Sequence, residues 1–304
     1  LHTKTPHLIT EAIKKGHVLS REGDVYKVLV NWELPEAQKL SHLKLNNVPS
    51  PIHRDYQWTG RLTPFKHQEV TSAFLTLNKK AFCFNEQGTG KTASVIWAVD
   101  YLMKRGDIKR VLVLCPLSIM KSAWQQDLFK FAMHRSCSVA HGSAERRKKI
   151  LAAGAEFVII NFDGVGVIKE EILAGGFDLI VVDEANAYKN AQTNRWKILR
   201  DIVNKTPWLW MLTGTPAAQS PVDAFGLAKL VNPENTPTYF GRFRDEVMYK
   251  VTQFKWAPKP DAQQTVHKVL QPAIRFERSQ CLDLPPVTYI EREAPLTPQQ
   301  SKYY

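Results

Sequence analysis

Short, wholly apolar runs alternate along this chain with stretches in which apolar residues recur every three or four positions. The apolar runs occupy residues 81–84, 111–114, 158–160, 179–182 and 208–212. Strands of a parallel sheet read as continuous apolar runs because helices cover both of their faces. The helical patterns lie between these runs, after Thr92 up to Gly106 and over residues 118–132, 144–153 and 165–174. The alternation predicts a three-layer α/β fold in which helices cover a parallel sheet on both sides.

A further helix is predicted from residue 220 onward. Ser220 is a suitable N-cap, Pro221 fits the first helical position, and Asp223 fits the third. The sequence therefore supplies a complete start signal at this point.

Residues 1–55 differ from the rest of the chain. A helical pattern spans residues 8–15, a strand pattern spans residues 25–30, and a polar stretch closes on Pro49 and Pro51. We interpret residues 1–55 as an accessory segment and residues 56–304 as the main domain. The segment either supports the main domain or takes part in recognising a substrate, and the sequence leaves both alternatives open.

The clearest chemical signal is the stretch N-E-Q-G-T-G-K-T at residues 85–92, which joins the apolar run 81–84 to a helical pattern. Its two glycines let the backbone turn so that successive N–H groups converge on phosphate oxygens. Lys91 supplies a cation for the β- and γ-phosphates, and the Thr92 hydroxyl can ligate Mg²⁺. The common pattern has a glycine where this chain has Asn85, so the match is to the shorter core G-x-G-K-T. The candidate nucleotide-binding residues of this loop are Gln87, Gly88, Thr89, Gly90, Lys91 and Thr92.

Two carboxylates directly follow the apolar run 179–182. Asp183 and Glu184 therefore emerge at the C-terminal end of a strand, where open α/β sheets bind ligands. The separation from Lys91 corresponds to about three strand-plus-helix units of roughly 30 residues each. We expect Asp183 to hold Mg²⁺, directly or through water, and Glu184 to orient or deprotonate the attacking water.

A glutamine lies about twenty residues before the phosphate loop. The side-chain amide of Gln68 has both a donor and an acceptor, the combination that pairs with adenine N7 and N6 and selects ATP over GTP. Arg61, Tyr56 or Trp58 could cover a face of the adenine, although aromatic residues at such positions more often belong to the core.

The composition is that of an ordinary globular chain of 304 residues with a net charge of +12 and a pI near 9.5, which favours a polyanionic partner such as nucleic acid. The four cysteines have no C-x-x-C spacing, so we expect neither a zinc site nor a disulfide framework. We expect a reducing, intracellular compartment.

No apolar stretch reaches 18 residues and no signal peptide opens the chain, so we expect no membrane insertion. The first residue, Leu1, suggests a processed or excerpted chain.

Together these residues resemble superfamily-two helicase-like ATPases, and in particular the Swi/Snf-type double-stranded DNA translocases. The resemblance covers roughly residues 60 to 304, and its motifs follow the family's order. Residues 62–68 resemble the adenine-reading motif, 88–92 motif I, 116–118 with Trp124 motif Ia, 183–186 with 189–190 motif II, and 212–216 motif III. Residues 284–286 and 296–300 also resemble the family's sequence at the junction between its first and second lobes.

The resemblance implies a RecA-like P-loop NTPase lobe that uses ATP and Mg²⁺. The family has two such lobes with ATP between them, and the second lobe supplies arginine fingers and half of the DNA track. These residues cover the first lobe alone, so we expect the isolated lobe to be nearly inactive. Arg195 and Arg200 fall within one helical pattern of this lobe, and we expect them to cover the sheet rather than to cross a cleft.

Coupling of hydrolysis to movement is assigned, through the resemblance, to motifs II and III. The candidate residues are Asn186, Thr213, Gly214 and Thr215. The family usually ends motif II with histidine, and this chain has Asn186. An asparagine still donates and accepts hydrogen bonds, so we expect ATP hydrolysis to be retained. This departure instead puts in question the coupling of hydrolysis to DNA movement.

The resemblance also places a double-stranded DNA track along the loops that follow the strands, with Ser118, Lys121 and Asn161 as the candidate contacts. Contacts of this kind go to phosphates and read no sequence. The basic run at residues 146–149 points all round a helix and is interpreted as a solvated face. The alternatives to a double-stranded DNA translocase are a nucleotide- or DNA-binding adaptor without turnover, and an RNA helicase.

Overall fold

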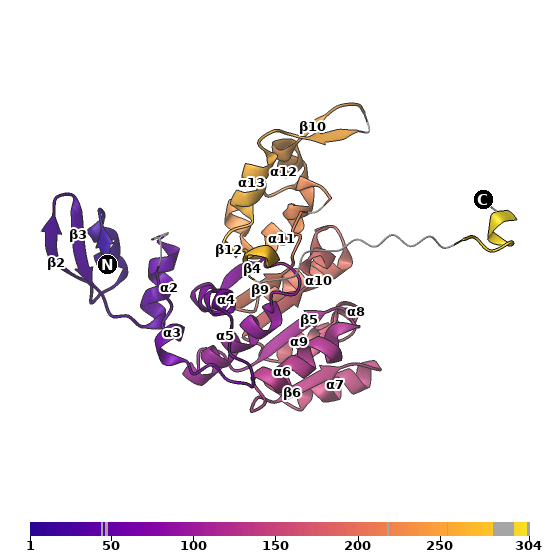
Figure 1. Ribbon diagram of the computed structural model, residues 1–304, viewed down its shortest axis with the longest axis horizontal. Helices are drawn as coiled ribbons and strands as arrows, with labels where there is room; N and C mark the ends of the chain where they lie inside the picture. Colours follow the sequence, from indigo (N-terminus) through magenta and orange to yellow (C-terminus); the bar gives the residue numbers. More distant parts are fainter. Residues whose placement is uncertain (44, 46–47, 218, 254, 282–294, 303–304) are drawn as a thin grey trace.

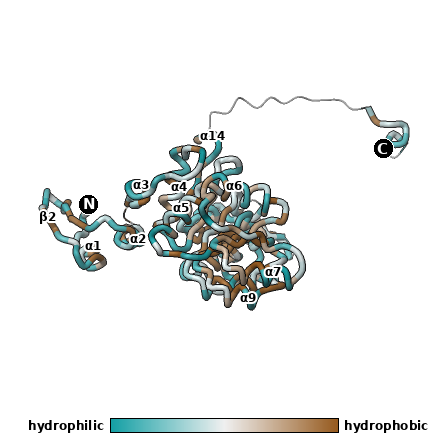
Figure 2. The backbone as a smooth tube through the Cα atoms, turned by 90° about the horizontal axis from the view of Figure 1, so that it is seen from below, coloured by the Kyte–Doolittle hydropathy of each residue, from teal (hydrophilic) through white to brown (hydrophobic). Residues whose placement is uncertain are grey.

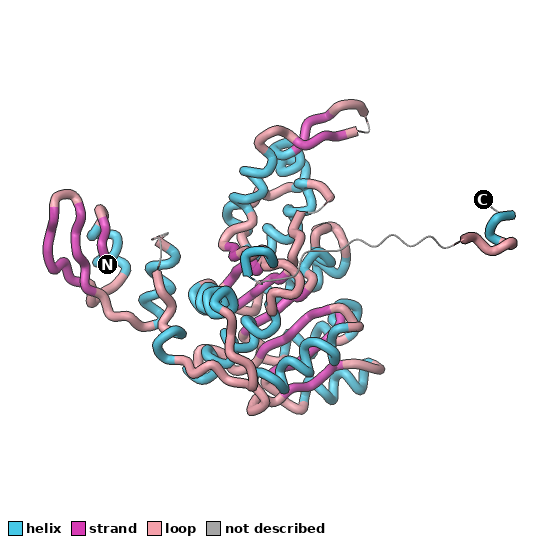
Figure 3. Tube along the Cα trace, viewed as in Figure 1, coloured by secondary structure: helices cyan, strands magenta, loops and turns pink. Residues whose placement is uncertain are grey.

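A seven-stranded parallel sheet forms the centre of the computed structural model, which describes residues 1–43, 45, 48–217, 219–253, 255–281 and 295–302. Figures 1 and 3 show its strands running through the lobe between helices. In spatial order the strands are β12 (Ala273–Ile274), β4 (Lys80–Cys83), β9 (Trp208–Leu212), β8 (Leu179–Asp183), β5 (Val111–Cys115), β7 (Phe157–Asn161) and β6 (Cys137–Ala140). The predicted parallel α/β architecture is confirmed.

Helices cover both faces of this sheet because alternate side chains of each buried strand point to opposite sides. On β5, Val111 and Val113 join the core of one face, whereas Leu112 and Leu114 join that of the other. The first face carries α2 (Leu34–His42), α3 (Ile52–Asp55), α4 (Lys66–Leu77), α5 (Lys91–Arg105), the π-helix η1 (Met120–Gln125) and α6 (Gln126–Phe131). The second carries α7 (Ala144–Ala152), α8 (Phe162–Val167), α9 (Lys169–Ala174), the 3-10 helix η2 (Ala185–Tyr188), α10 (Asn194–Val203) and the helices that follow β9. Figure 2 shows the apolar segments gathered inside the lobe.

A small antiparallel sheet precedes the lobe and stands apart from the main sheet in Figure 1. Its strands β1 (His2–Thr3), β3 (Val25–Leu29) and β2 (His17–Glu22) pair in that order, and α1 (Pro6–Ala12) packs on it. Helix α2 belongs to two cores, because Leu40 packs with this sheet while Leu34 and Ala37 pack in the lobe. The division at residue 55 stays a prediction.

The chain between β9 and β12 builds a helical region on one end of the sheet (Figure 1). It contains η3 (Pro221–Asp223), α11 (Ala224–Val231), η4 (Pro233–Asn235), α12 (Phe240–Val247), the hairpin of β10 (Met248–Lys250) with β11 (Trp256–Pro258), and α13 (Ala262–Val269). The predicted position of the helix start, after Ser220, is confirmed. The predicted N-cap is wrong, since the Ser220 side chain makes no capping hydrogen bond and the first turn is a 3-10 helix. Asp223 instead accepts from Lys189 Nζ at 3.1 Å.

Four other elements differ from the sequence patterns. The helix expected over residues 118–132 begins as the π-helix η1, and the helix expected over 165–174 is divided between α8 and α9. Strands β6 and β12 were not predicted. The short helices α14 (Arg278–Cys281) and η5 (Gln300–Lys302) end the described chain, and residues 284–286 lie outside it.

A separate finding concerns membranes. Within the described ranges, every helix is too short or too polar to span a bilayer.

Candidate nucleotide-binding site

The candidate residues meet at one edge of the sheet because the parallel strands all end there. Pairing places Cys83 of β4 and Asp183 of β8 on either side of Leu212 of β9. The Thr213 amide then donates to the Cys83 carbonyl at 3.1 Å, which fixes the loop after β9 beside the phosphate loop. The structure thus brings together the loop at residues 85–92, the carboxylates at 183–184 and the hydroxyls at 213–215.

The two glycines of the phosphate loop adopt backbone conformations that other residues avoid. Gly88 has φ 83° and Gly90 has φ 75°, both in the left-handed region. A Cβ on Gly90 would also overlap the Gln68 side chain. Helix α5 begins directly after Gly90, so its N-terminal N–H groups face the loop, an arrangement suited to binding phosphate.

The Lys91 ammonium lies within the loop. It donates to the carbonyl of Asn85 at 2.8 Å and to that of Glu86 at 3.2 Å. An ammonium held by two neutral carbonyls is available to an anion, because phosphate oxygens are stronger acceptors for a cation. Thr92 is half-buried in the first turn of α5, directly after the loop, and its role as a Mg²⁺ ligand stays a prediction.

Asn85, which replaces the usual first glycine, ties the loop to two other segments. Its Nδ2 donates to Thr71 Oγ1 of α4 at 2.8 Å, and its Oδ1 accepts from the Phe276 amide at 3.0 Å. The side chain is buried. The departure from the common pattern therefore has a structural role that a glycine could not perform.

Gln68 is buried against the loop rather than extended into solvent. Its Oε1 accepts from the Phe65 amide at 2.9 Å, and its Nε2 donates to the Thr89 carbonyl at 3.2 Å. The ring of His67 reaches the same Thr89 carbonyl, with Nε2 at 2.8 Å. Gln68 therefore fixes the shape of the loop, and its pairing with adenine stays a prediction.

The residues expected to cover the adenine occupy different environments. Arg61 is exposed, and its backbone N–H reaches the Lys130 carbonyl at 3.4 Å. Tyr56 is buried and donates its hydroxyl to Asp100 at 2.7 Å, so it belongs to the core. Trp58 is half-buried with its ring edge-on to those of Tyr56 and Trp97. Of the three, Arg61 alone is exposed, and its contact with a nucleotide stays a prediction.

Asp183 is buried and has a hydrogen bond on each oxygen. Oδ2 accepts from Trp124 Nε1 at 2.9 Å, and Oδ1 accepts from the Glu184 amide at 3.0 Å. Burial raises the pKa of Asp183, and the Trp124 hydrogen bond and the nearby Lys91 charge only partly oppose this effect. The carboxylate is thus held in one orientation at a position where a cation would stabilise its charged form.

Glu184 is the only non-glycine residue among those described with a positive φ, at 52°. Left-handed backbone at a residue with a Cβ costs about 1–3 kcal/mol, and such strain concentrates at functional sites. Glu184 is half-buried, and the turn leads into η2, where the Ala187 amide donates to the Glu184 carbonyl at 3.2 Å.

Asn186 joins the loop after β8 to the loop after β9. Its Nδ2 donates to the Thr215 carbonyl at 2.8 Å and to Thr215 Oγ1 at 3.2 Å. Gly214 lies against the phosphate loop, since a Cβ there would be 3.7 Å from the Asn85 carbonyl oxygen. The loop after β9 therefore contacts both the loop after β8 and the phosphate loop, and the coupling role of these residues stays a prediction.

The predicted DNA contacts are only partly accessible. Ser118 and Lys121 are exposed after β5, whereas the Asn161 side chain is buried and accepts from Arg147 Nη1 at 3.0 Å. A contact of Asn161 with DNA stays a prediction. Arg147 also donates to the Gly142 carbonyl at 2.9 Å, so the interpretation of residues 146–149 as a solvated face is wrong for this residue. Its exposed neighbours do fit that interpretation.

Three contributors were missed by sequence reasoning: the Trp124 hydrogen bond, the Asn85 bridge and the backbone of residues 272–278 beside the phosphate loop. The Asn85–Phe276 contact joins positions 191 residues apart, and no local pattern encodes such a pair. The one available signal was the replacement of glycine by asparagine in an otherwise matching loop.

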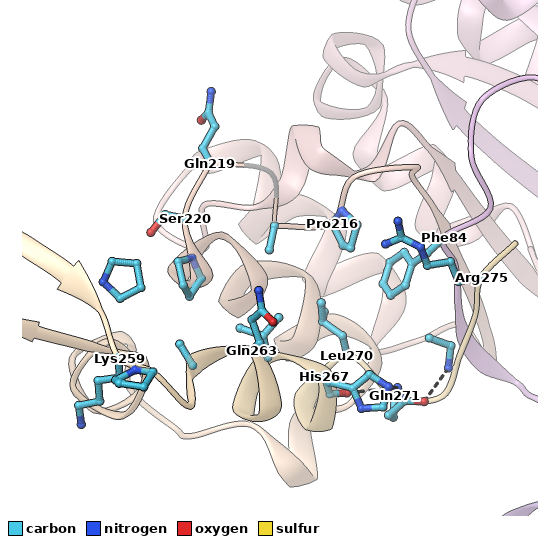
Figure 4. Close-up of a pocket in the computed structure, with 17 residues that line it drawn as sticks. Phe84, Pro216, Gln219, Ser220, Lys259, Gln263, His267, Leu270, Gln271 and Arg275 are labelled. Carbon is cyan, nitrogen blue, oxygen red and sulfur yellow. Dashed lines mark hydrogen bonds between the residues drawn. The ribbon is translucent and has the colours of Figure 1, made fainter. Parts of the chain in front are cut away.

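A pocket of about 550 Å³ lies next to this site, between α13 and the loop that follows β9. Phe84, Pro216 and Arg275 lie at one end of it, while Gln263 and His267 project from α13 (Figure 4). None of Lys91, Asp183 and Glu184 lines it. The candidate catalytic residues therefore lie outside this pocket.

A parallel α/β sheet with a phosphate loop after one strand and an Asp-Glu pair after another defines a P-loop nucleoside triphosphatase lobe. The model of the SNF2-related domain matches residues 30–304, and the chain belongs to that family. The match begins before the boundary expected at residue 55.

Relatives of this chain include named helicases. The uncharacterised ATP-dependent helicase YqhH of Bacillus subtilis (strain 168) is 29% identical over 213 residues, which cover 67% of this chain and 35% of the relative. Chromodomain-helicase-DNA-binding protein 1-like of Mus musculus is 27% identical over 229 residues, which cover 72% of this chain and 24% of the relative. Among solved structures, the Sulfolobus solfataricus SWI2/SNF2 ATPase core in complex with dsDNA matches with a TM-score of 0.60 at 22% identity. The match covers 73% of this chain and 46% of that structure's chain. The chain thus spans less than half of the length of these proteins.

Proposed function

We propose that this chain is the ATP-binding and ATP-hydrolysing lobe of a DNA-dependent ATPase that translocates on double-stranded DNA. The observation that supports this most directly is the contact between motifs II and III, because Asn186 bonds Thr215 beside the carboxylate pair. A nucleotide-binding site alone does not need such a link. A motor does, since the chemistry must be transmitted to the surface that moves.

The site residues have distinct roles in this proposal. Lys91 neutralises phosphate charge, and Glu184 orients or deprotonates the attacking water. Thr92 and Asp183 would hold Mg²⁺, which prefers hard oxygen ligands and supplies positive charge to the phosphates when bound. The donor set fits, because a buried carboxylate with one hydrogen bond on each oxygen retains lone pairs for a cation.

We propose that duplex DNA is the polyanion that this positively charged chain binds. The net charge is +12, and exposed Ser118 and Lys121 follow β5 at the edge that carries the site. The SWI2/SNF2 core that shares this fold is bound to dsDNA. An RNA helicase would use the same edge, and the choice of nucleic acid in the assay separates the two.

A complete catalytic centre also needs an arginine finger, worth about 10³ to 10⁵ in turnover in P-loop enzymes. Arg195 pairs with Asp163 at 2.6 Å, and Arg200 pairs with Asp201 at 2.8 Å, so both are engaged on the surface of α10. We propose that a second lobe supplies the finger, as in the resembled family. The 304-residue chain should then bind ATP weakly and hydrolyse it hardly at all.

The test is steady-state ATP hydrolysis by this chain and by a longer protein that includes the second lobe. Each is assayed with duplex DNA, single-stranded DNA and RNA, and Lys91→Ala is the control for the phosphate loop. We expect duplex-stimulated turnover in the longer protein alone, abolished by Lys91→Ala. Stimulation by RNA but not by duplex DNA would support the RNA helicase, and nucleotide binding without turnover in the longer protein would support the adaptor.

A further inference from the structure

The backbone after β12 (Ala273–Ile274) stays hydrogen-bonded beside β4 and the start of the phosphate loop. The Phe84 amide donates to the Ile274 carbonyl at 2.8 Å, and the Glu86 amide donates to the Phe276 carbonyl at 3.0 Å. The Asn85 side chain adds the bond to the Phe276 amide described above. These bonds bring the second residue after Phe276 next to the phosphate loop.

Arg278 is that residue, and two contacts fix its position. Its backbone N–H donates to the Glu86 carboxylate at 2.9 Å. Its side chain extends over the loop, because a Cβ built on Gly88 would lie 3.8 Å from Arg278 Cδ. The stem of an exposed arginine thus lies across the first glycine of the G-x-G-K-T core.

The charge environment of Arg278 differs from that of most arginines in the lobe. In the described part of the chain its guanidinium has no carboxylate within ion-pair distance, whereas Arg275 has Glu277 at 3.8 Å and Arg135 has Asp100 at 2.6 Å. A guanidinium presents a planar fork of donors that matches phosphate oxygens, and it is always charged. A guanidinium that has no carboxylate partner among the described residues, and whose Cδ lies close to Gly88, is suited to a phosphate ligand.

We propose that Arg278 is a nucleotide-binding residue that contacts the polyphosphate of the bound nucleoside triphosphate. This inference rests on the proposed function and deepens it. Lys91 supplies one positive charge to the phosphates, while Glu86 places a negative charge in the same loop. Arg278 offsets that charge and approaches from the side of Gly88, so the phosphates are held by cations from two segments that are far apart in the sequence.

The experiment measures displacement of a fluorescent ATP analogue from the 304-residue chain by ATP and by inorganic tripolyphosphate. Tripolyphosphate isolates phosphate recognition from base recognition. Arg278→Gln is compared with Arg275→Gln, a matched change three residues earlier whose side chain lies beside Phe84 in the neighbouring pocket (Figure 4). Arg278→Lys retains the charge but not the fork, and thermal unfolding without nucleotide checks that each variant is folded.

We expect Arg278→Gln to weaken both ATP and tripolyphosphate about tenfold, the usual scale for one hydrogen bond to a charged group. Arg278→Lys should recover part of the loss, and Arg275→Gln should match the unmodified chain. If Lys91→Ala abolishes binding while Arg278→Gln binds as tightly as Arg275→Gln, the role of Arg278 is wrong and the phosphate loop stands. If the unmodified chain binds neither ATP nor tripolyphosphate, both proposals fail.

Discussion

The indole N–H of Trp124 donates to Oδ2 of Asp183 at 2.9 Å, which joins the π-helix η1 to the end of β8. Trp124 is fully buried, so the donor has one fixed direction. π-Helical turns are rare and occur often at functional sites. The π-helical turn thus carries the residue that bonds the carboxylate which we propose as a metal ligand.

Trp124→Phe tests this relationship through pH. The hydrogen bond favours the charged form of Asp183, so its loss raises the pKa of a carboxyl that burial has already raised. Metal binding needs the carboxylate, and the acid limb of Mg²⁺-ATP turnover in a two-lobed protein should therefore move to higher pH. Trp210→Phe is the matched control, because the Trp210 N–H donates to the Asn78 carbonyl at 2.9 Å inside the same lobe. Equal acid limbs in the two variants would contradict the assignment.

Glu184→Gln separates binding from chemistry. The substitution keeps the size and the strained backbone position but removes the base, so turnover in the two-lobed protein should fall by roughly a hundredfold or more. Binding of ATP with Mg²⁺ should be retained, because Asp183 and Lys91 are unchanged. The measurement pairs steady-state turnover with nucleotide affinity, and Glu170→Gln, an exposed change on α9, is the control. Normal turnover would reduce Glu184 to a loop carboxylate.

Gln68→Ala tests base selection. A positioned amide that pairs bidentately with adenine is worth about 1–3 kcal/mol, so the preference for ATP over GTP should erode. The structure adds a second expectation, since the amide also bonds the Thr89 carbonyl and its loss should weaken both nucleotides. Competition by ATP and GTP, compared with Lys66→Ala on the exposed side of α4, measures both effects. Equal weakening of ATP and GTP would leave Gln68 as a support of the loop alone.

The strands that the sequence predicts are those buried on both faces, because such strands are apolar throughout. Strand β8 is buried at every position. Strand β6 lies at the edge of the sheet and is only partly buried. Its sequence, Cys137–Ala140, therefore mixes polar and apolar residues and lacks the continuous apolar run that predicts a buried strand. Strand β12 has two residues and exists because β4 offers an unpaired edge.

The site divides in the same way. Residues whose chemistry is fixed by local spacing, such as Lys91 and Asp183, could be placed from the sequence, because a loop between a strand and a helix has few geometries. Residues placed by tertiary contact could not. Arg147 is charged and is therefore expected to be exposed, yet three acceptors on Ala140, Gly142 and Asn161 allow it to be buried. Trp124 has the same character, since only the folded lobe reveals which acceptor its N–H meets.

Asp100→Asn tests the stability of the lobe. The Asp100 side chain is fully buried and accepts from Tyr56 at 2.7 Å, from His134 at 2.7 Å and from Arg135 at 2.6 Å. Burial alone would raise the pKa of Asp100, but these donors outweigh it and lower the pKa. Breaking such a buried pair costs about 3–5 kcal/mol, which denaturant unfolding at neutral pH would detect.

The sign of the pH dependence follows from the lowered pKa. The stabilisation by Asp100 is complete above the pKa of about 3.9 of an unfolded aspartate and is lost as pH falls through the lower pKa of the folded state. Asp100→Asn should therefore flatten the loss of stability below about pH 4. Asp107→Asn, which breaks the exposed pair with Arg105, should cost less than about 1 kcal/mol. An equal cost for both variants would show that the Asp100 network contributes no more than a surface ion pair.

Asn186→Ala tests whether the contact between motifs II and III transmits hydrolysis to movement. The Asn186 amide bonds Thr215, and neither of its contacts touches Lys91, Asp183 or Glu184, so DNA-stimulated hydrolysis in the two-lobed protein should stay within about tenfold. Movement should be lost, because the loops after β8 and β9 are no longer joined by this side chain. Triplex displacement per ATP hydrolysed measures the coupling, and Asn204→Ala, an exposed change at the end of α10, is the matched control. Asn186→His, which restores the usual residue of the family, should support movement if it reaches the same Thr215 acceptors. Undiminished displacement per ATP in Asn186→Ala would falsify the coupling role, whereas loss of hydrolysis itself would move Asn186 into the catalytic group.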